Sequence, residues 1–224
     1  MFTISLLGQK GGTGKTTVAL GLAVAAFRAG KVVAVIDLDP QASAANWKDR
    51  RSDNNPAVVS AQSSRLKQTL TAAEEMGAEI VIIDTAGRND DSALNAARFA
   101  DLVLIPTRTN IVELEALPAA ADILRLAGGP KAFVVLNGVH PAANRQVAEA
   151  RELVQRTFGL PCAPIHLCHR SAYADAMTSG RTPQELDEDG KAAGELDALF
   201  QFSFEFVNSR TGEHVQDRIA ASRA

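Results

Sequence analysis

The sequence predicts an α/β protein with a single doubly wound, mostly parallel β-sheet and helices on both faces. Short apolar runs bounded by glycine, proline or aspartate alternate with longer helical patterns along the 224 residues, which is typical of β-α-β units. Several runs, above all 80–83 and 133–136, are apolar at every position. Such runs are expected for strands that are covered on both faces, so the pattern favours a doubly wound sheet over a sandwich.

Seven strands are expected in chain order, with helices in the intervals. The first strand leads into a glycine-rich loop, and a helix over 18–29 follows that loop. A polar helix end and loop occupy 49–55, and an acidic helix follows residue 184. We expect one domain over 1–208 and a polar tail over 209–224. The expected strands lie at 2–7, 32–36, 57–60, 80–83, 102–105, 132–136 and, more weakly, around 164–167.

The composition excludes several classes of protein. A net charge of −3 gives no overall attraction to nucleic acid or anionic lipid, so binding to either requires a local patch. The spacing of Cys162 and Cys168 fits neither a redox pair nor a zinc site, and we expect reduced thiols. No apolar run approaches the roughly 20 residues that cross a bilayer, and the glycine loop leaves no room for a signal peptide before it. These features predict a soluble, cytoplasmic protein without a membrane partner.

The glycine-rich loop, Q-K-G-G-T-G-K-T-T from Gln9 to Thr17, predicts a phosphate-binding site. A glycine turn at a helix N-terminus can meet a phosphate chain with backbone N–H groups and the positive helix end. Lys15 is expected to reach the β and γ phosphates, and the Thr16 hydroxyl to bind magnesium. The alternative is a glycine turn with an incidental Gly-Lys-Thr. The residues expected to contact the nucleotide in this loop are Lys10, Gly11, Gly12, Thr13, Gly14, Lys15, Thr16 and Thr17.

Two further strands end in carboxylates. Asp37 and Asp39 follow the second strand, and Asp84 follows the strand at 80–83. Open α/β sheets bind their ligands at the carboxyl ends of the strands, so we expect these groups near the phosphate loop. Asp84 is expected to serve magnesium directly or through its shell, and Gly87 to offer an N–H to the γ-phosphate. For Asp39, a plain Asp-Pro turn is the alternative.

The departures from the standard loop carry a family resemblance. Gln9 stands where the first glycine of G-x-x-x-x-G-K-[ST] is usual, Lys10 precedes the paired glycines, and D-L-D-P-Q ends the second strand. In these features the chain resembles the ParA/MinD family of ATPases with a deviant Walker A loop. The resemblance implies catalytic roles for three residues: Lys15 at the phosphates, Lys10 acting on the nucleotide across a dimer interface, and Asp37 orienting the attacking water.

One motif points to a rival class. Asp84 opens the string D-T-A-G-R, which is at home in signal-recognition-type GTPases. Those GTPases recognise guanine with a lysine–aspartate pair. The corresponding strand here ends in N-G-V-H, which begins at Asn137 and contains no such pair. Adenine is therefore expected, with ATP and Mg²⁺ as the cofactors. Asn137 resembles the adenine-contacting asparagine of the ParA/MinD family, although asparagine is also an ordinary turn residue after a strand.

Within the family, the chain most resembles small plasmid-partition ParA proteins of the ParF type. S-A-A-N-W around Trp47 and the segment from Arg170 to Gly180 are similar to theirs, although Trp47 is also a natural core anchor. Branches that hold iron–sulfur clusters need clustered cysteines, which this sequence lacks. The MinD branch needs a basic C-terminal amphipathic helix, whereas the C-terminal region here is acidic and its phenylalanines are expected to pack on the sheet.

The resemblance implies a partition or positioning function, including chromosome segregation. A Mg-ATP-dependent homodimer would bind DNA without sequence preference, associate with the nucleoid, and be released when a cargo-bound ParB-like activator stimulates hydrolysis. A scaffold that positions a protein cargo without DNA binding is the alternative, besides the GTPase. Arg50, Arg51 and Arg88 receive no role. The candidate DNA contacts are Arg145, Arg151, Arg156 and Arg170.

Overall fold

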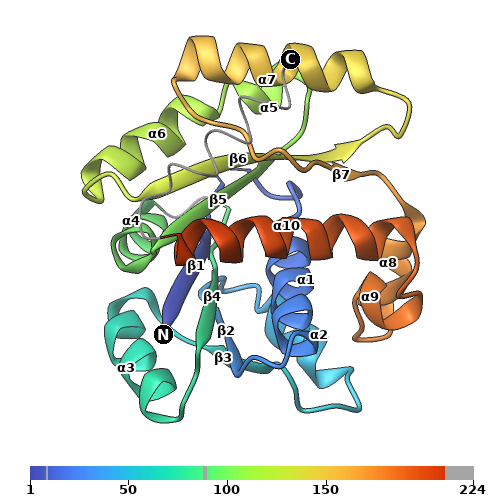
Figure 1. Ribbon diagram of the computed structural model, residues 1–224. Coiled ribbons are helices and arrows are strands. Elements are labelled where there is room, and N and C mark those ends of the chain that lie inside the picture. The colour runs from blue at the N-terminus through green and yellow to red at the C-terminus, as the bar shows by residue number, and fades with distance from the viewer. Residues whose placement is uncertain (9, 88–89, 210–224) are drawn as a thin grey trace.

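The computed structural model describes residues 1–8, 10–87 and 90–209 (Figure 1). Seven strands form one sheet in the order β3-β2-β4-β1-β5-β6-β7, with parallel pairing between all neighbours in the described chain. The predicted fold class is confirmed. The strands are β1 (Phe2–Leu6), β2 (Val33–Asp37), β3 (Ala57–Ser60), β4 (Ile80–Asp84), β5 (Leu102–Thr107), β6 (Lys131–Val139) and β7 (Leu167–Cys168).

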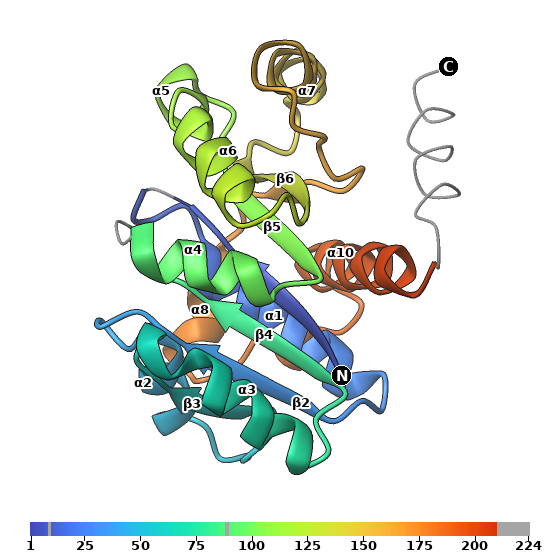
Figure 2. The same cartoon turned by 90° about the vertical axis from the view of Figure 1, so that its left-hand side faces the viewer.

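Helices cover both faces of this sheet. Figure 2 shows the strands between α10 on one side and α4 and α6 on the other. The first layer consists of α1 (Lys15–Arg28), α2 (Ser43–Asp49), α8 (Ser171–Thr178), α9 (Pro183–Leu186) and α10 (Lys191–Asn208). The opposite layer contains α3 (Leu66–Glu75), α4 (Asp90–Phe99), α5 (Ile111–Leu114), α6 (Leu117–Leu126) and α7 (Asn144–Phe158), together with the 3-10 turn η1 (Ser63–Arg65).

The helix α10 packs on the sheet through its phenylalanines, as the sequence predicted. Phe202 and Phe206 both meet the ring of Phe133 edge to face, with centroids 4.9 Å apart. Gly21 lets α10 approach α1 closely, because a Cβ at this position would lie 2.6 Å from Leu196. The acidic helix after residue 184 is thus a core element. In the described ranges, none of the helices combines the length and the apolar character that a membrane span requires.

The strand register brings the predicted motifs to one edge. Asp84 pairs in register with Leu6 of β1 on one side and with Asp37 of β2 on the other. The central strand β1 lies between β4 and β5, so the chain order reverses at the point where the glycine-rich loop leaves the sheet. Such a switch point is where open α/β sheets bind ligands. The fold therefore places the loop and both carboxylates together.

Candidate functional site

The loop after β1 ends at the N-terminus of α1. Gly12 and Gly14 have φ angles of 78° and 92°, which glycine adopts without the penalty that a side chain imposes. Gly14 is the N-cap of α1, and no side chain caps this end. The first N–H groups of the helix are therefore available to an anion. Gln9 lies outside the described residues.

Lys15, the first residue of α1, is buried beside this loop. Only 7% of the residue is exposed, and its Nζ donates a hydrogen bond to the Lys10 carbonyl at 3.2 Å. Burial lowers the pKa of Lys15, while the carboxylates of Asp84 and Asp39 oppose that change. A lysine held in a dry position without an ion pair among the described residues is suited to an anionic ligand.

Asp84 is the most deeply buried acid of the site. Neither carboxylate oxygen makes a hydrogen bond in the described structure, and the residue is 0% exposed. Burial raises the pKa of Asp84 to about 7; the nearby Thr16 hydroxyl opposes the rise, although it does not reach hydrogen-bond geometry. A cation beside Thr16 would compensate the buried carboxylate, so the two residues fit a magnesium site. No cluster of three or more acidic, histidine or cysteine ligands occurs in the described ranges.

The loop that follows β4 touches the phosphate loop. A Cβ at Gly87 would lie 3.0 Å from the backbone nitrogen of Gly11, so a side chain at this position would require the phosphate loop to shift. The hydroxyl of Thr85 donates a hydrogen bond to the Leu6 carbonyl at 2.6 Å. These contacts fix the end of β4 against the end of β1. Arg88, which the sequence left without a role, lies outside the described residues.

Asp37 holds the N-terminus of α2. One carboxylate oxygen accepts a hydrogen bond from the Asp39 amide at 3.0 Å, and the other accepts from Ala44 at 3.0 Å and Ala45 at 3.2 Å. Burial raises the pKa of Asp37, and these three backbone donors counteract the rise. The role of Asp37 toward water stays a prediction. Asp39 accepts from the Gln41 amide at 2.9 Å, so it forms the Asp-Pro turn that was the alternative for it.

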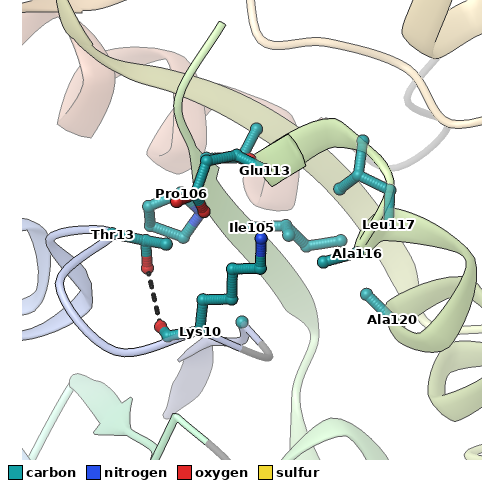
Figure 3. Close-up of a pocket in the computed structure, with 10 residues that line it drawn as sticks. Lys10, Thr13, Ile105, Pro106, Glu113, Ala116, Leu117 and Ala120 are labelled. Atoms are coloured by element: carbon teal, nitrogen blue, oxygen red, sulfur yellow. Dashed lines mark hydrogen bonds between the residues drawn. The ribbon is translucent and has the colours of Figure 1, made fainter. Parts of the chain in front are cut away.

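Lys10 extends away from the loop toward α5. Its Nζ donates a hydrogen bond to the Val112 carbonyl at 2.6 Å. Figure 3 shows this side chain beneath Ile105 and beside Glu113, in a small cavity between the loop and α5. The lysine therefore does not point at the phosphate position of its own chain.

Asn137 lies on the phosphate loop. Its Nδ2 donates a hydrogen bond to the Thr13 carbonyl at 2.7 Å, and its Oδ1 accepts from the Gly138 amide at 2.8 Å. The predicted adenine contact is not tested by this geometry. The half-buried Thr17 lies in the first turn of α1, next to Thr16.

Three of the four arginines proposed for DNA lie on α7, and the fourth, Arg170, is the N-cap of α8. Arg145 and Arg156 are exposed on α7 and pair with Glu149 and Glu152. Arg151 donates to backbone carbonyls of Ala163 and Pro164. Arg170 pairs with Glu195 at 2.6 Å, and its side chain is only 23% exposed. Arg170, which the sequence motif favoured most strongly as a DNA contact, thus forms an ion pair with α10 within the chain.

The structure gives Arg51 a structural role that the sequence did not reveal. Its guanidinium pairs with Glu185 at 2.7 Å, donates to the Gly180 carbonyl at 2.8 Å and stacks over the Trp47 ring at 4.3 Å. Trp47 is fully buried, and its Nε1 donates to the Arg181 carbonyl at 2.9 Å. The sequence interpretation of Trp47 as a core anchor is confirmed. No sequence signal pairs Arg51 with a residue so distant in the chain.

The loop, the free helix end and the buried Lys15 and Asp84 define a P-loop nucleotide-binding protein. A family model described as the CobQ/CobB/MinD/ParA nucleotide binding domain matches residues 4–183. The chain belongs to this family. The resemblance to ParA/MinD-family ATPases is confirmed.

Known proteins agree with this assignment. The "maintenance of carboxysome distribution protein A" of Gloeobacter kilaueensis is 31% identical over 200 residues, which are 88% of this chain and 90% of the relative. The septum site-determining protein MinD of Pyrococcus horikoshii, complexed with Mg-ADP, is 17% identical with a TM-score of 0.69, over 93% of this chain and 96% of that one. A Cyanothece McdA variant in complex with ATP is 17% identical with a TM-score of 0.64, over 92% and 96% of the two chains. The two structures share the fold.

Proposed function

We propose that this protein is a ParA-type positioning ATPase. In this proposal Mg-ATP joins two copies face to face, the dimer binds DNA without sequence preference, and a cargo-bound ParB-like partner stimulates hydrolysis and release. The observation that carries the nucleotide chemistry is the buried, unpartnered carboxylate of Asp84 beside the buried Lys15 and the glycine loop. The Asp84 carboxylate can compensate a metal cation, and the Lys15 ammonium can compensate the phosphates, so the two buried charges suit a metal–phosphate ligand.

The residues of the site divide the work. The loop amides and Lys15 would hold the phosphate chain, while Thr16 and Asp84 would hold Mg²⁺, which would neutralise negative charge on the phosphates. Asp37 orients the attacking water from the end of β2. Slow turnover is expected, because an assembly signal that hydrolysed its ATP quickly could not hold a dimer. The MinD–Mg-ADP and McdA–ATP complexes support the choice of ligand.

The position of Lys10 supports the dimer. This lysine points out of its own phosphate site and binds the carbonyl of Val112, whose neighbour Ile111 is 54% exposed while Val112 itself is 61% exposed. A second copy that covers this apolar helix end would bring its nucleotide to the lysine. Lys10 then neutralises charge on the leaving γ-phosphoryl group of the partner.

The dimer is tested by light scattering with ATP and with a non-hydrolysable ATP analogue. Besides the Asp37→Ala variant, the analogue is needed because removing Asp37 also removes the cap of α2. We expect a dimer with either ligand and a monomer with ADP. The Lys10→Ala variant should still bind nucleotide but remain monomeric. A monomer of the unaltered chain with the analogue would refute the dimer.

DNA binding is tested on the ATP-bound form with unrelated duplexes at increasing salt. Binding through phosphates should weaken steeply as salt rises, because each contact releases counterions. If the protein does not bind the duplexes at low salt, or if its binding does not change with salt concentration, the proposal of DNA binding is contradicted. Competition between ATP and GTP checks the expected preference for adenine.

A scaffold that positions a protein cargo without DNA is the second candidate. Arg145, Arg156 and Arg170 each pair with a glutamate, which offsets the positive charge of these three predicted DNA contacts. The name of the Gloeobacter relative refers to carboxysome distribution, so a protein assembly is a suitable cargo under either candidate. The salt-dependent binding experiment separates the two.

A further inference from the structure

We propose that Asn137 and Arg108 are positioning residues that hold the phosphate loop in its ligand-binding shape. This inference rests on the proposed function and explains how its phosphate site is organised. Arg108 directly follows β5, and Asn137 lies near the carboxyl end of the neighbouring strand β6. Arg108 Nη2 donates to the Gly12 carbonyl at 3.2 Å, and Asn137 Nδ2 donates to the Thr13 carbonyl at 2.7 Å. Two successive loop carbonyls are thus held by two adjacent strands.

Because the peptide bond is planar, the two hydrogen bonds to these carbonyls also orient the N–H groups of the same peptides. In a trans peptide the carbonyl and the following N–H point to opposite sides. The Gly12 carbonyl shares its peptide with the Thr13 N–H, and the Thr13 carbonyl shares its peptide with the Gly14 N–H. Drawing both carbonyls toward the ends of β5 and β6 turns both N–H groups the other way. Successive N–H groups on one side form a concavity that binds anions.

Asn137 can hold only one orientation in this arrangement. The Gly138 amide is a donor, so the atom that faces it must be Oδ1, and Nδ2 must then face the Thr13 carbonyl. The side chain is packed tightly on the loop, since a Cβ at Gly14 would lie 2.2 Å from Nδ2. Both ends of the amide are therefore occupied within the chain.

Two further hydrogen bonds hold the loop at the carbonyl of Lys10. The Lys10 carbonyl accepts from Lys15 Nζ at 3.2 Å and from the Thr13 hydroxyl at 3.4 Å. The loop thus meets its ligand with the carbonyls of Lys10, Gly12 and Thr13 already hydrogen-bonded. Preorganisation of this kind raises affinity, because the ligand does not have to order the loop.

The positioning role and an adenine contact by Asn137 predict different selectivity. A residue that shapes the phosphate loop should matter equally for every ligand with a phosphate chain. A residue that reads the base should matter for adenine nucleotides alone. Inorganic tripolyphosphate, which has no base, separates the two.

The experiment is calorimetric titration of Asn137→Ala and Arg108→Ala with Mg-ATP, Mg-GTP and Mg-tripolyphosphate. Asn137→Ala should weaken all three ligands by a similar factor of about three to ten, the value of one hydrogen bond. Arg108→Ala should do the same, and Arg108→Lys, which keeps a donor, should recover most of the affinity. Arg125→Ala, an exposed arginine on α6 paired with Asp122, is the matched control and should change nothing.

Two results would overturn the proposal. If Asn137→Ala weakens the binding of ATP alone, Asn137 is an adenine contact. If neither variant changes the affinity for any ligand, the hydrogen bonds to the loop carbonyls do not position the loop for binding. Thermal melting identifies a variant that fails to fold, and the exposed Arg108 keeps the test available if Asn137→Ala does so. The hydrogen bonds from Arg108 and Asn137 to the loop lie within one chain, so a chain that never dimerises would end the dimer proposal and leave this one standing.

Discussion

At the carboxyl edge of the sheet, Lys15 and Asp84 are buried without an ion pair in the described structure, whereas in the layer of α2, α8 and α9 the buried Arg51 is paired. Arg51 reaches both oxygens of Glu185 and two backbone carbonyls. Burying a charge without a partner costs folding free energy, and pairing offsets that cost. The paired region holds the fold together, and the unpaired one keeps charges ready for a ligand.

The Lys15→Met variant should produce the largest effect of the comparison. The lysine stem is conserved in shape, the buried charge is lost, and the phosphate chain loses its charged donor. We expect nucleotide affinity to fall about 100-fold or more, the order expected for a charge-assisted contact to phosphate. Thermal stability without ligand should stay equal or rise, because the buried ammonium is gone. A drop in stability would show that Lys15 supports the fold.

The Arg51→Ala variant should show the opposite pattern. It leaves Glu185 and the Gly180 carbonyl without their partner and removes the stack on Trp47. We expect a loss of about 3 kcal/mol, which corresponds to a fall in Tm of roughly 6–12 °C for a chain of this size. Nucleotide affinity at a temperature where the variant is folded should be unchanged. Arg50→Ala is the neighbouring control, since among the described residues the Arg50 side chain donates one long bond, to the Met177 carbonyl at 3.3 Å.

The Asp84→Asn variant tests the unpaired carboxylate through pH. The pKa of Asp84 is raised from 3.8 to about 7 in the folded chain. The contribution of this group to the free energy of unfolding is therefore greatest below about pH 4, and it is lost as the pH rises through about 7. Without metal or nucleotide, the variant should lack this decline and should be more stable by about 4 kcal/mol at pH 8. Parallel pH profiles of the two proteins would contradict the assignment.

The sequence predicted the architecture well because local patterns determine it. Fully apolar strands and the glycine loop identify the parallel sheet, and strand ends collect at one edge in any such sheet. The environment of each side chain could not be predicted in the same way. Asp37 caps α2, Asn137 grips the loop, and Arg170 is tied to Glu195. These contacts depend on how the chain returns in space, and a resemblance names the residue without showing its neighbours.

Arg145 and Arg156 form a third kind of charge, because both are exposed and paired on their own helix. Their side chains are 92% and 78% exposed, with partners at i+4 and i−4. Exposed pairs of this type contribute little to stability, so replacing both with alanine should move Tm by less than about 2 °C. If these arginines contact DNA phosphates in the ATP-bound dimer, the same double variant should make the slope of log affinity against log salt concentration shallower. The expected change is about one for each arginine removed. An unchanged salt slope would remove α7 from the DNA surface and would favour the scaffold that works without DNA.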